Sequence, residues 1–311
     1  MGQGSNCKRC AKNRKDLSHH TKFTPVKDFD VYSLASLPAK LPLPKSGIVE
    51  YVKACAPLVV RISSRLVSNK RPGLKKSKNY PFADKRGCRV SHLGSGWVRS
   101  VFGPVKDICR CHKCAKSRSG KTFPKYWKVM IYTARHFVHN EEEARECEAV
   151  LFDGSAAEDT LTQTILTGNE FLVAGTDRDY CRMVCFTHDE ALAQQLKKLC
   201  DVRYKTLARL QQEMSADLDI PRDVAVPVVV ISYPHGCQCC TSVGKLKVVP
   251  PGAEGGASLV QYTAATCVGC SGAMVLAFGR LVGDHGQRFI SCYPHSGTVQ
   301  GQKLGESDGW V

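Results

Sequence analysis

Short apolar segments separated by turn residues dominate the chain between residues 59 and 187. The first is Val59-Val60-Arg61-Ile62, in which three apolar residues flank one cation. Further strand-like segments follow at 95–102, 127–133, 147–152, 160–166, 170–174 and 180–186. Short strands that alternate with turns are typical of a β-barrel or a β-sandwich. The pattern therefore predicts a mainly β fold for this part of the chain.

The hydrophobic period changes after Thr187. Thr187 and Glu190 match a capping box, which marks the start of a helix. Leucines then recur at helical spacing, at positions 192, 196, 199, 207 and 210. We expect an amphipathic helix from about 188 to 216, broken near Asp201. A second group of strands is predicted at 226–231, 243–249, 258–264, 273–278, 281–284 and 288–292.

The chain accordingly divides into four parts. Residues 1–50 are basic and rich in proline, and we expect most of them to form a disordered tail. Residues 51–187 form the first β unit, with a cysteine-rich loop at 105–123, and residues 188–216 form the linking helix. Residues 217–311 form the second β unit. No run of eighteen apolar residues is present, so no transmembrane helix is predicted.

The cysteines and the N-terminus bear on the compartment. The chain has 17 cysteines among 311 residues, and its first residues contain no apolar signal core. We therefore expect a cytoplasmic protein with mostly reduced thiols, in which cysteine clusters are read first as metal ligands. A nuclear or membrane-peripheral location stays open.

The net charge of +16 is unevenly distributed. Residues 1–128 contain 29 Lys and Arg against 6 Asp and Glu. Such a segment can bind a polyanion, either nucleic acid or acidic lipid, or an acidic protein. A solvated basic tail explains the same charges equally well, and no nucleic-acid-binding motif is present.

Three residues have the chemistry of a nucleophilic triad. Ser271 lies in the turn Cys267-Val268-Gly269-Cys270-Ser271-Gly272, where the backbone N–H groups of Gly269 and Ser271 can point at one oxygen. His136 is the candidate general base and Asp179 the candidate partner of its imidazole. Asp177 is a rival to Asp179, and we prefer Asp179 because a strand follows it directly. Cys270 is a rival nucleophile, which we expect to face away.

Four motifs, two of which contain His136 and Asp179, resemble motifs of trypsin-like serine proteases and follow one another in the order found in that family. They are Gly94-Ser95-Gly96-Trp97-Val98, Thr133-Ala134-Arg135-His136, Asp179-Tyr180-Cys181-Arg182-Met183 and Tyr233-Pro234-His235-Gly236. His136 and Asp179 are 43 positions apart, and Asp179 and Ser271 are 92 apart, against about 45 and about 93 in the template. The resemblance covers roughly residues 57 to 300 and not the first fifty.

This resemblance implies a fold of two six-stranded antiparallel β-barrels and a serine endopeptidase that works through an acyl-enzyme. The chain is similar to an intracellular type with a lengthened helix between the barrels. Two positions depart from the family pattern: Cys270 replaces the usual Asp before the serine, and Ala273-Met274 replaces Gly-Pro. A different class fits the same features: a protease-fold binding protein with an idle triad, which docks a polyanion or acidic partner through its basic N-terminal half.

The resemblance also indicates a substrate pocket at Ala265, Thr266 and His295. Ala265 stands where trypsin has a carboxylate, so Lys and Arg substrates would lack a partner for their charge. Thr266 and His295 resemble the pair that binds Glu or Gln side chains in glutamyl endopeptidases and 3C-type proteases. An exposed loop position explains His295 equally well. The spacing from Ser271 requires an inserted hairpin near Gly283-Asp284.

A cysteine cluster in the first half predicts a structural zinc site. Cys109, Cys111, His112 and Cys114 place four potential ligands within six residues. Tetrahedral Zn²⁺ takes thiolate and imidazole ligands, often from such tight turns. More distant ligands could come from Cys7, Cys10 or Cys88, and a loop of free thiols is the alternative interpretation. The chemistry proposed for the triad needs no cofactor.

Overall fold

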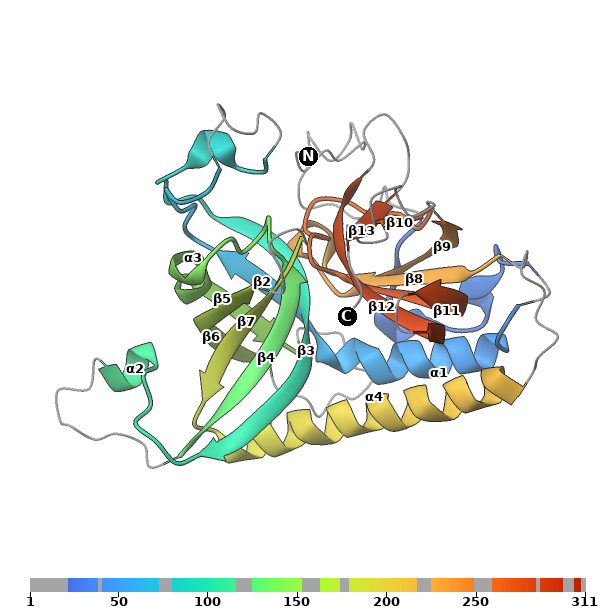
Figure 1. Ribbon diagram of the computed structural model, residues 1–311, viewed down its shortest axis with the longest axis horizontal. Coiled ribbons are helices and arrows are strands. Elements are labelled where there is room, and N and C mark those ends of the chain that lie inside the picture. The colour runs from blue at the N-terminus through green and yellow to red at the C-terminus, as the bar shows by residue number, and fades with distance from the viewer. Residues whose placement is uncertain are drawn as a thin grey trace.

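Two antiparallel β-barrels stand side by side in the computed structural model of the chain, above two packed helices (Figure 1). The structure describes residues 22–38, 41–72, 80–115, 125–152, 163–173, 179–216, 225–248, 259–283, 286–298 and 305–308. Among these residues, no helix is both long and apolar enough to cross a membrane.

The first barrel closes in the strand order β2-β3-β4-β7-β6-β5. Its strands are β2 (Val59–Ser64), β3 (His92–Val105), β4 (Tyr126–Ala134), β5 (Cys147–Leu151), β6 (Thr164–Val173) and β7 (Tyr180–Thr187). Val60 and Ile62 of β2 belong to the apolar interior of this barrel, whereas Val59 faces the interface with the rest of the molecule. The alternation of side chains along a strand thus lets β2 serve two cores.

The second barrel closes in the order β8-β9-β10-β13-β12-β11, because β8 pairs with both β9 and β11. Its strands are β8 (Pro227–Ser232), β9 (Cys240–Val248), β10 (Leu259–Tyr262), β11 (Met274–Gly283), β12 (Gly286–Thr298) and β13 (Gly305–Asp308). The short strand β1 (Thr24–Pro25) adds to the edge of β9. The mainly β fold of two six-stranded antiparallel barrels is confirmed.

Strand β8 is apolar at nearly every position because both of its faces are covered. Val228 and Val230 point into the second barrel, whereas Val229 and Ile231 point into a core shared with the helices. A strand that is buried on both faces reads as a continuous hydrophobic run instead of an alternating one.

The helix α4 (Glu190–Ala216) packs against both barrels (Figure 1). Leu192 and Leu196 contribute to the core of the first barrel, and Leu210 and Met214 contribute to the core beneath the second. Its 27 residues span about 40 Å. The helix is unbroken through Asp201, which corrects the expected break.

The start of α4 also differs from the expected capping box. The Asp189 carboxylate accepts a hydrogen bond from the Leu192 backbone N–H at 3.0 Å, so Asp189 is the N-cap. Thr187 is instead the last residue of β7, and its hydroxyl accepts the Asp189 N–H at 3.1 Å. Thr187 pairs with Trp127 as part of the barrel, so the cap lies two positions further along the chain, at Asp189.

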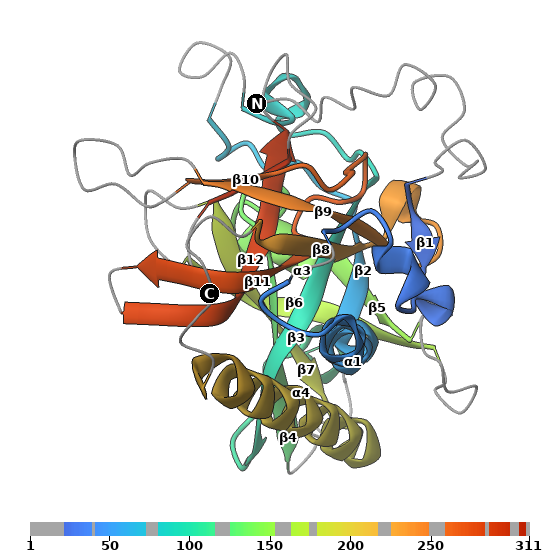
Figure 2. The same ribbon diagram turned by 90° about the vertical axis from the view of Figure 1, so that its right-hand side faces the viewer.

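The N-terminal region is folded from residue 22 onwards wherever the structure describes it. The helix α1 (Lys45–Cys55) lies between α4 and the barrels, as Figure 2 shows. Phe29, Leu34 and Leu43 are buried in the same core as α1. This corrects the expectation of a disordered tail for residues 22–38 and 41–50, because their apolar side chains cover the outer face of the second barrel. Residues 1–21 lie outside the described part.

Two pairs of predicted strands are single strands in the structure. The segments expected at 160–166 and 170–174 are joined in β6, where the register shifts between Gly168 and Glu170. The segments expected at 273–278 and 281–284 are joined in β11, with an irregularity between Phe278 and Leu281. A bulge interrupts the alternation of side chains without ending the strand.

Short helical segments complete the described chain. They are α2 (His112–Ala115), α3 (Glu141–Arg145) and the 3-10 helices Val26–Asp28, Tyr32–Leu34, Ala56–Leu58, Ala83–Lys85 and Pro234–Gly236.

The dual packing of α4 leads to a stability prediction. Leu196→Ala and Leu210→Ala should each lower the free energy of unfolding by about 2–5 kcal/mol, since each leaves a cavity in a different core. Val202→Ala, on an exposed position of the same helix, should change it by less than about 0.5 kcal/mol. Urea denaturation followed by circular dichroism measures all three. An effect of Leu210→Ala as small as that of Val202→Ala would contradict the bridging role of the helix.

Candidate active site and cysteine cluster

The three candidate catalytic residues come from the ends of strands in both barrels. His136 follows β4 and Asp179 precedes β7, and these strands pair so that Ala134 lies opposite Tyr180. The pairing brings His136 and Asp179 together although they are far apart in sequence. Ser271 lies in the tight turn that leads into β11 of the second barrel.

Hydrogen bonds connect these three side chains one after another. The His136 Nδ1 lies 2.6 Å from Asp179 Oδ2, and the His136 Nε2 lies 2.9 Å from Ser271 Oγ. The His136 backbone N–H also donates to Asp179 Oδ1 at 2.8 Å, which fixes the carboxylate. His136 and Ser271 are 5% and 8% exposed. The rival carboxylate, Asp177, lies outside the described residues.

Ser95 of β3 connects the nucleophile turn to the first barrel. Its backbone N–H donates to the Ser271 carbonyl at 2.8 Å, and its hydroxyl donates to the Gly269 carbonyl at 2.8 Å. The hydroxyl also accepts the Tyr233 backbone N–H at 2.9 Å, and the Thr133 hydroxyl donates to the Ser95 carbonyl at 2.7 Å. Ser95 is fully buried, so these bonds are protected from water. This residue belongs to a motif of the predicted resemblance, but its function as the connection between barrels was not foreseen.

Two glycines let the nucleophile turn approach its neighbours. Gly269 has φ +91°, and a Cβ there would meet the Tyr233 carbonyl oxygen at 2.5 Å. Gly272 has φ +78°, and its Cβ would meet the Thr133 Oγ1 at 2.2 Å. Left-handed φ and such contacts exclude a larger side chain at either position. The turn is therefore pressed against both barrels.

The turn leaves two backbone donors available. Within the part of the chain that the structure describes, neither the Gly269 nor the Ser271 backbone N–H has a protein acceptor. Cys270, between them, is fully buried, and its thiol donates to the Ser232 hydroxyl at 3.3 Å. The structure thus brings Ser271, and not the thiol of Cys270, to His136.

A buried ion pair holds the backbone after His136. Arg71 and Glu143 make two bonds of 2.6 Å, and both side chains are fully buried. Arg71 also donates to the carbonyls of His136 at 2.6 Å and Phe137 at 2.9 Å. The sequence analysis missed both charged residues. Arg71 stands in a basic run and Glu143 in an acidic one, and neither pattern shows that they are buried and paired.

The candidate pocket places His295 beside the nucleophile turn. The His295 carbonyl accepts the Gly272 backbone N–H at 2.8 Å, and the His295 Nδ1 lies 2.6 Å from the Tyr262 hydroxyl. Burial lowers the pKa of His295 to about 3, and the neighbouring His136 acts in the same direction. Ala265 and Thr266 are half-buried. His295 is 3% exposed, which corrects the alternative of an exposed loop residue.

The expected hairpin is also present, because β11 and β12 extend as one antiparallel pair as far as Gly283 and Gly286. This extension explains the long spacing between Ser271 and His295.

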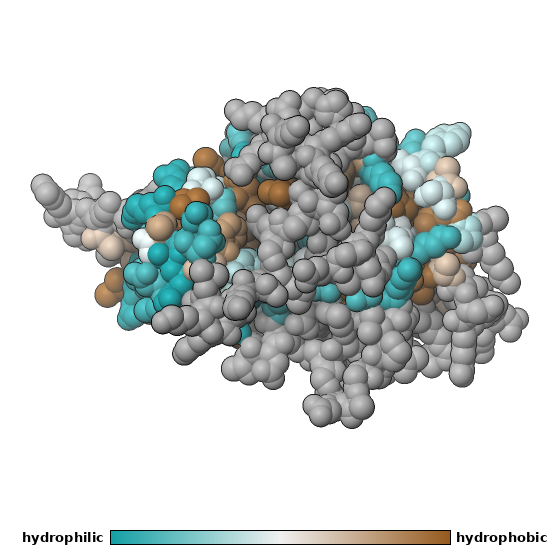
Figure 3. All heavy atoms as spheres, turned by 90° about the horizontal axis from the view of Figure 1, so that it is seen from above, coloured by the Kyte–Doolittle hydropathy of each residue, from teal (hydrophilic) through white to brown (hydrophobic). Residues whose placement is uncertain are grey.

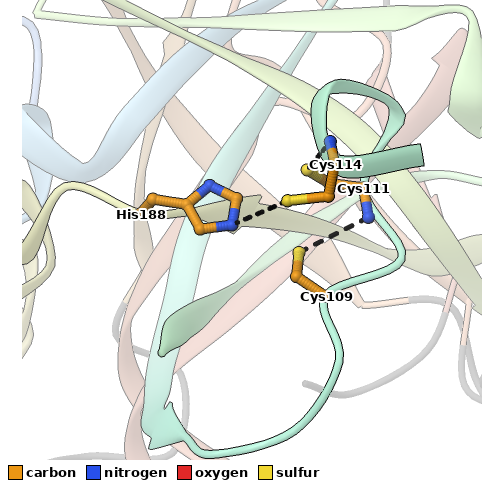
Figure 4. Close-up of side chains that lie close together, drawn as sticks. All are labelled: Cys109, Cys111, Cys114 and His188. Carbon is orange, nitrogen blue, oxygen red and sulfur yellow. Dashed lines mark hydrogen bonds between the residues drawn. The ribbon is translucent and has the colours of Figure 1, made fainter. Parts of the chain in front are cut away.

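The cysteine-rich loop gathers three sulfurs and an imidazole (Figure 4). Cys109, Cys111, Cys114 and His188 have ligand atoms that all lie within 4.8 Å of one another. The fourth ligand predicted from the sequence was His112, whose side chain lies outside the described residues. His188 comes from the junction of β7 and α4, which no local spacing could reveal. Cys88 is exposed, and Cys7 and Cys10 lie outside the described residues.

Basic residues of the first 128 positions pair with acidic residues that come later in the chain. Four such pairs lie on the first barrel: Arg65 with Glu148, Arg89 with Glu146, Lys125 with Glu190 and Lys128 with Glu170. Hydrophilic side chains gather on the first-barrel side of the face in Figure 3. The charge asymmetry along the sequence is thus partly neutralised in space, and the described residues give polyanion binding no support.

The contacts of Ser95 predict a loss of stability on mutation. Ser95→Ala should lower the free energy of unfolding by about 1–3 kcal/mol, because the buried Gly269 carbonyl and Tyr233 N–H would lose their partner. Ser100→Ala, at a half-buried position of the same strand, should change it by less than about 0.5 kcal/mol. Thermal and urea unfolding of the two variants compare them directly. Equal stability of both would show that the contacts of Ser95 contribute nothing.

Comparison with known proteins gives a likeness in structure only. No protein-family model matches the sequence, and no curated protein matches it. Similar solved structures include the active form of the Rv3671c protease from M. tuberculosis, with a TM-score of 0.42 and 13% identity over 88% of this chain and 85% of that one. The protease Anisep from Arthrobacter nicotinovorans has a TM-score of 0.41 and 11% identity over 83% and 91% of the two chains.

A thermostable serine protease, AL20, from an extremophilic microorganism has a TM-score of 0.40 and 10% identity over 82% of this chain and 91% of that one. Because these TM-scores are low, the fold is assigned from the strand pairings of this chain and not from the likeness to these structures. Those pairings, two closed six-stranded antiparallel barrels, are those of the chymotrypsin fold.

Proposed function

We propose that this chain is a serine endopeptidase that hydrolyses peptide bonds through an acyl-enzyme. The observation that carries the proposal is the unbroken line of hydrogen bonds from Asp179 through His136 to Ser271. A serine hydroxyl is a weak nucleophile until a base takes its proton, and His136 Nε2 lies within reach to do so. The substrate is accordingly a peptide or protein.

The first half of the reaction forms the acyl-enzyme. Ser271 Oγ attacks the carbonyl carbon of the scissile bond while its proton moves to His136 Nε2. The carbonyl oxygen gains negative charge, which the available N–H groups of Gly269 and Ser271 would stabilise. Asp179 holds the imidazole with Nδ1 protonated and stabilises the imidazolium. When the tetrahedral intermediate collapses, His136 gives the proton to the departing amine.

The second half releases the new carboxyl end. A water molecule takes the place of the amine and gives a proton to His136 as its oxygen attacks the acyl carbon. The same N–H groups again face the charged oxygen. Collapse of this second intermediate breaks the ester bond, and the proton on His136 returns to Ser271 Oγ. No metal takes part in these steps.

We further propose that the pocket at Ala265, Thr266 and His295 selects glutamine. Burial keeps His295 neutral, and its Nδ1 lies 2.6 Å from the Tyr262 hydroxyl. With this hydroxyl taken as the donor of the bond, the ring proton is on Nε2. A neutral N–H donor suits the amide oxygen of Gln. The neutral His295 offers a Glu carboxylate no positive charge, and burying an unpaired carboxylate is costly. This refines the expectation of Glu or Gln made from the sequence.

The proposed nucleophile can be tested by covalent labelling. A tagged fluorophosphonate should modify the purified protein once per chain, because only an activated serine reacts with it. Ser271→Ala and His136→Ala should abolish labelling and peptide hydrolysis, leaving at most the residual 10³ to 10⁴-fold over water that remains without a triad. Intact mass spectrometry and a peptide-library assay measure the two effects.

Cys270→Ala is the matched control for the nucleophile. Cys270 is adjacent to Ser271 in the chain and is buried away from His136. The Cys270→Ala protein should therefore still react with the fluorophosphonate. A wild-type protein that folds but neither reacts nor hydrolyses any peptide would contradict the proposal. That outcome would favour a protease-fold binding protein with an idle triad.

The pocket proposal predicts the sign of a pH effect. The folded imidazole of His295 has a pKa of about 3, below the unperturbed value of about 6.5, so it stays neutral from pH 5 to pH 8. The preference for Gln over Glu, Lys and Arg should therefore be constant across this range. The contribution of the buried imidazole to folding stability is fully present above pH 6.5 and is lost as the pH falls towards 3.

Cleavage profiling at several pH values measures this preference. His295→Ala should lower kcat/KM on Gln substrates by about tenfold or more, with little change on small apolar ones. Tyr262→Phe should lower kcat/KM on Gln substrates less, because the imidazole stays in place and only the hydrogen bond that fixes its tautomer is lost. A preference for Lys and Arg that survives His295→Ala would overturn the pocket assignment.

A further inference from the structure

We propose that Cys109, Cys111, Cys114 and His188 bind one structural zinc ion that connects the β3–β4 loop to the start of α4. Three of the ligands come from the cysteine-rich loop, and the fourth comes from the β7–α4 junction about seventy-four positions later. The four side chains point toward a common centre in Figure 4. The proposed triad does not use any of them.

The geometry of the cluster is close to that of a tetrahedral site. A zinc ion with Zn–S bonds of about 2.3 Å holds its sulfurs about 3.8 Å apart. The four ligand atoms all lie within 4.8 Å of one another, so a contraction of about 1 Å or less completes the tetrahedron. The Cys114 Sγ and His188 Nε2 are already 3.4 Å apart.

The surroundings of the sulfurs also suit a metal. The Cys111 backbone N–H points at Cys109 Sγ and the Cys114 N–H at Cys111 Sγ, each at 3.4 Å. Backbone donors of this kind stabilise thiolates, which are the form that binds zinc. The three cysteines are 3%, 6% and 8% exposed and His188 is half-buried, so the sulfurs are shielded from solvent, as they are in structural zinc sites. Thiolate and imidazole together select zinc over hard cations.

The location of His188 gives the ion a structural purpose. His188 directly precedes Asp189, the N-cap of α4, so a bond to zinc would fix the point at which the helix leaves the barrel. The same junction carries a second, exposed link, from Lys125 to Glu190 at 2.5 Å. Among the described residues, the loop between β3 and β4 contributes three cysteines to a small apolar cluster that Tyr126 completes and that Val105 and Phe186 flank. A metal would supply the stability that this small cluster lacks.

Metal content of the whole chain tests the proposal without reference to activity. Protein purified without chelators should contain about one zinc per chain by elemental analysis. His188→Ala and Cys111→Ser should lose it, whereas His112→Ala and Cys88→Ser should keep it. His188→Cys should also keep it, because a fourth thiolate can replace the imidazole. This last variant separates loss of a ligand from a general failure to fold.

Cobalt substitution gives an independent readout. Chelated wild-type protein titrated with Co²⁺ should develop the visible absorption of a tetrahedral thiolate site, saturating at about one ion per chain. Its thermal midpoint should fall on chelation by roughly 5 °C or more and recover with Zn²⁺. A metal-free protein with no cobalt spectrum would overturn the proposal. Retention of zinc by His188→Ala with loss in His112→Ala would overturn the assignment of the fourth ligand.

Discussion

The buried hydrogen bonds of Ser95 are the constraint on which the candidate active site depends. His136 and Asp179 belong to the first barrel and Ser271 to the second, so the bond of 2.9 Å between His136 and Ser271 crosses the interface. Ser95 holds the carbonyls of Ser271 and Gly269 from the opposite side of that interface. A misplacement of 1 Å can cost an enzyme about a hundredfold in rate. The connection between barrels therefore has to be rigid, and three short bonds from one buried residue to the second barrel make it so.

The helical layer supplies the same rigidity on a larger scale. The helix α4 places leucines in the cores of both barrels, and the buried guanidinium of Arg203 donates to the β3 carbonyls of Val98 and Arg99. The helix α1 packs in the core shared by α4 and the second barrel. Neither barrel can turn relative to the other without opening one of these apolar contacts. The proposed zinc site lies at the end of α4 that leaves the first barrel, and would fix that end.

Charge has two different uses in this molecule. The exposed pairs on the first barrel contribute little individually, since water and salt screen them. The pair of Arg71 and Glu143 is fully buried. It positions the backbone after β4, because Arg71 donates hydrogen bonds to the carbonyls of His136 and Phe137. Removing one partner would leave an uncompensated buried charge, which is strongly destabilising. The same side-chain chemistry thus contributes little where water screens it and fixes the geometry of the candidate site where it is buried.

Local patterns in the sequence were sufficient for much of the fold, and they named three residues that the structure brings within hydrogen-bond distance of one another. Strand alternation and the leucine spacing of α4 can be read within short segments of the sequence. The motifs that contain His136, Asp179 and Ser271 can be read from their order along the chain. The structure contains the strands, the helix and the three residues. The cap at Asp189 and the joined strands β6 and β11 were missed. A bulge or a shifted boundary depends on what the neighbouring strand requires.

Only the tertiary structure could decide which distant residues meet. Residues 22–50 look like a basic tail because their few apolar residues are scattered, yet Phe29, Leu34 and Leu43 find a hydrophobic face to cover. Arg71 meets Glu143, and His188 meets three cysteines, across more than seventy positions. Such partners are set by the closure of the barrel, which brings strand ends together irrespective of their separation in the chain. Sequence determines the chemistry that each segment offers, and barrel closure determines which of those chemistries share one site.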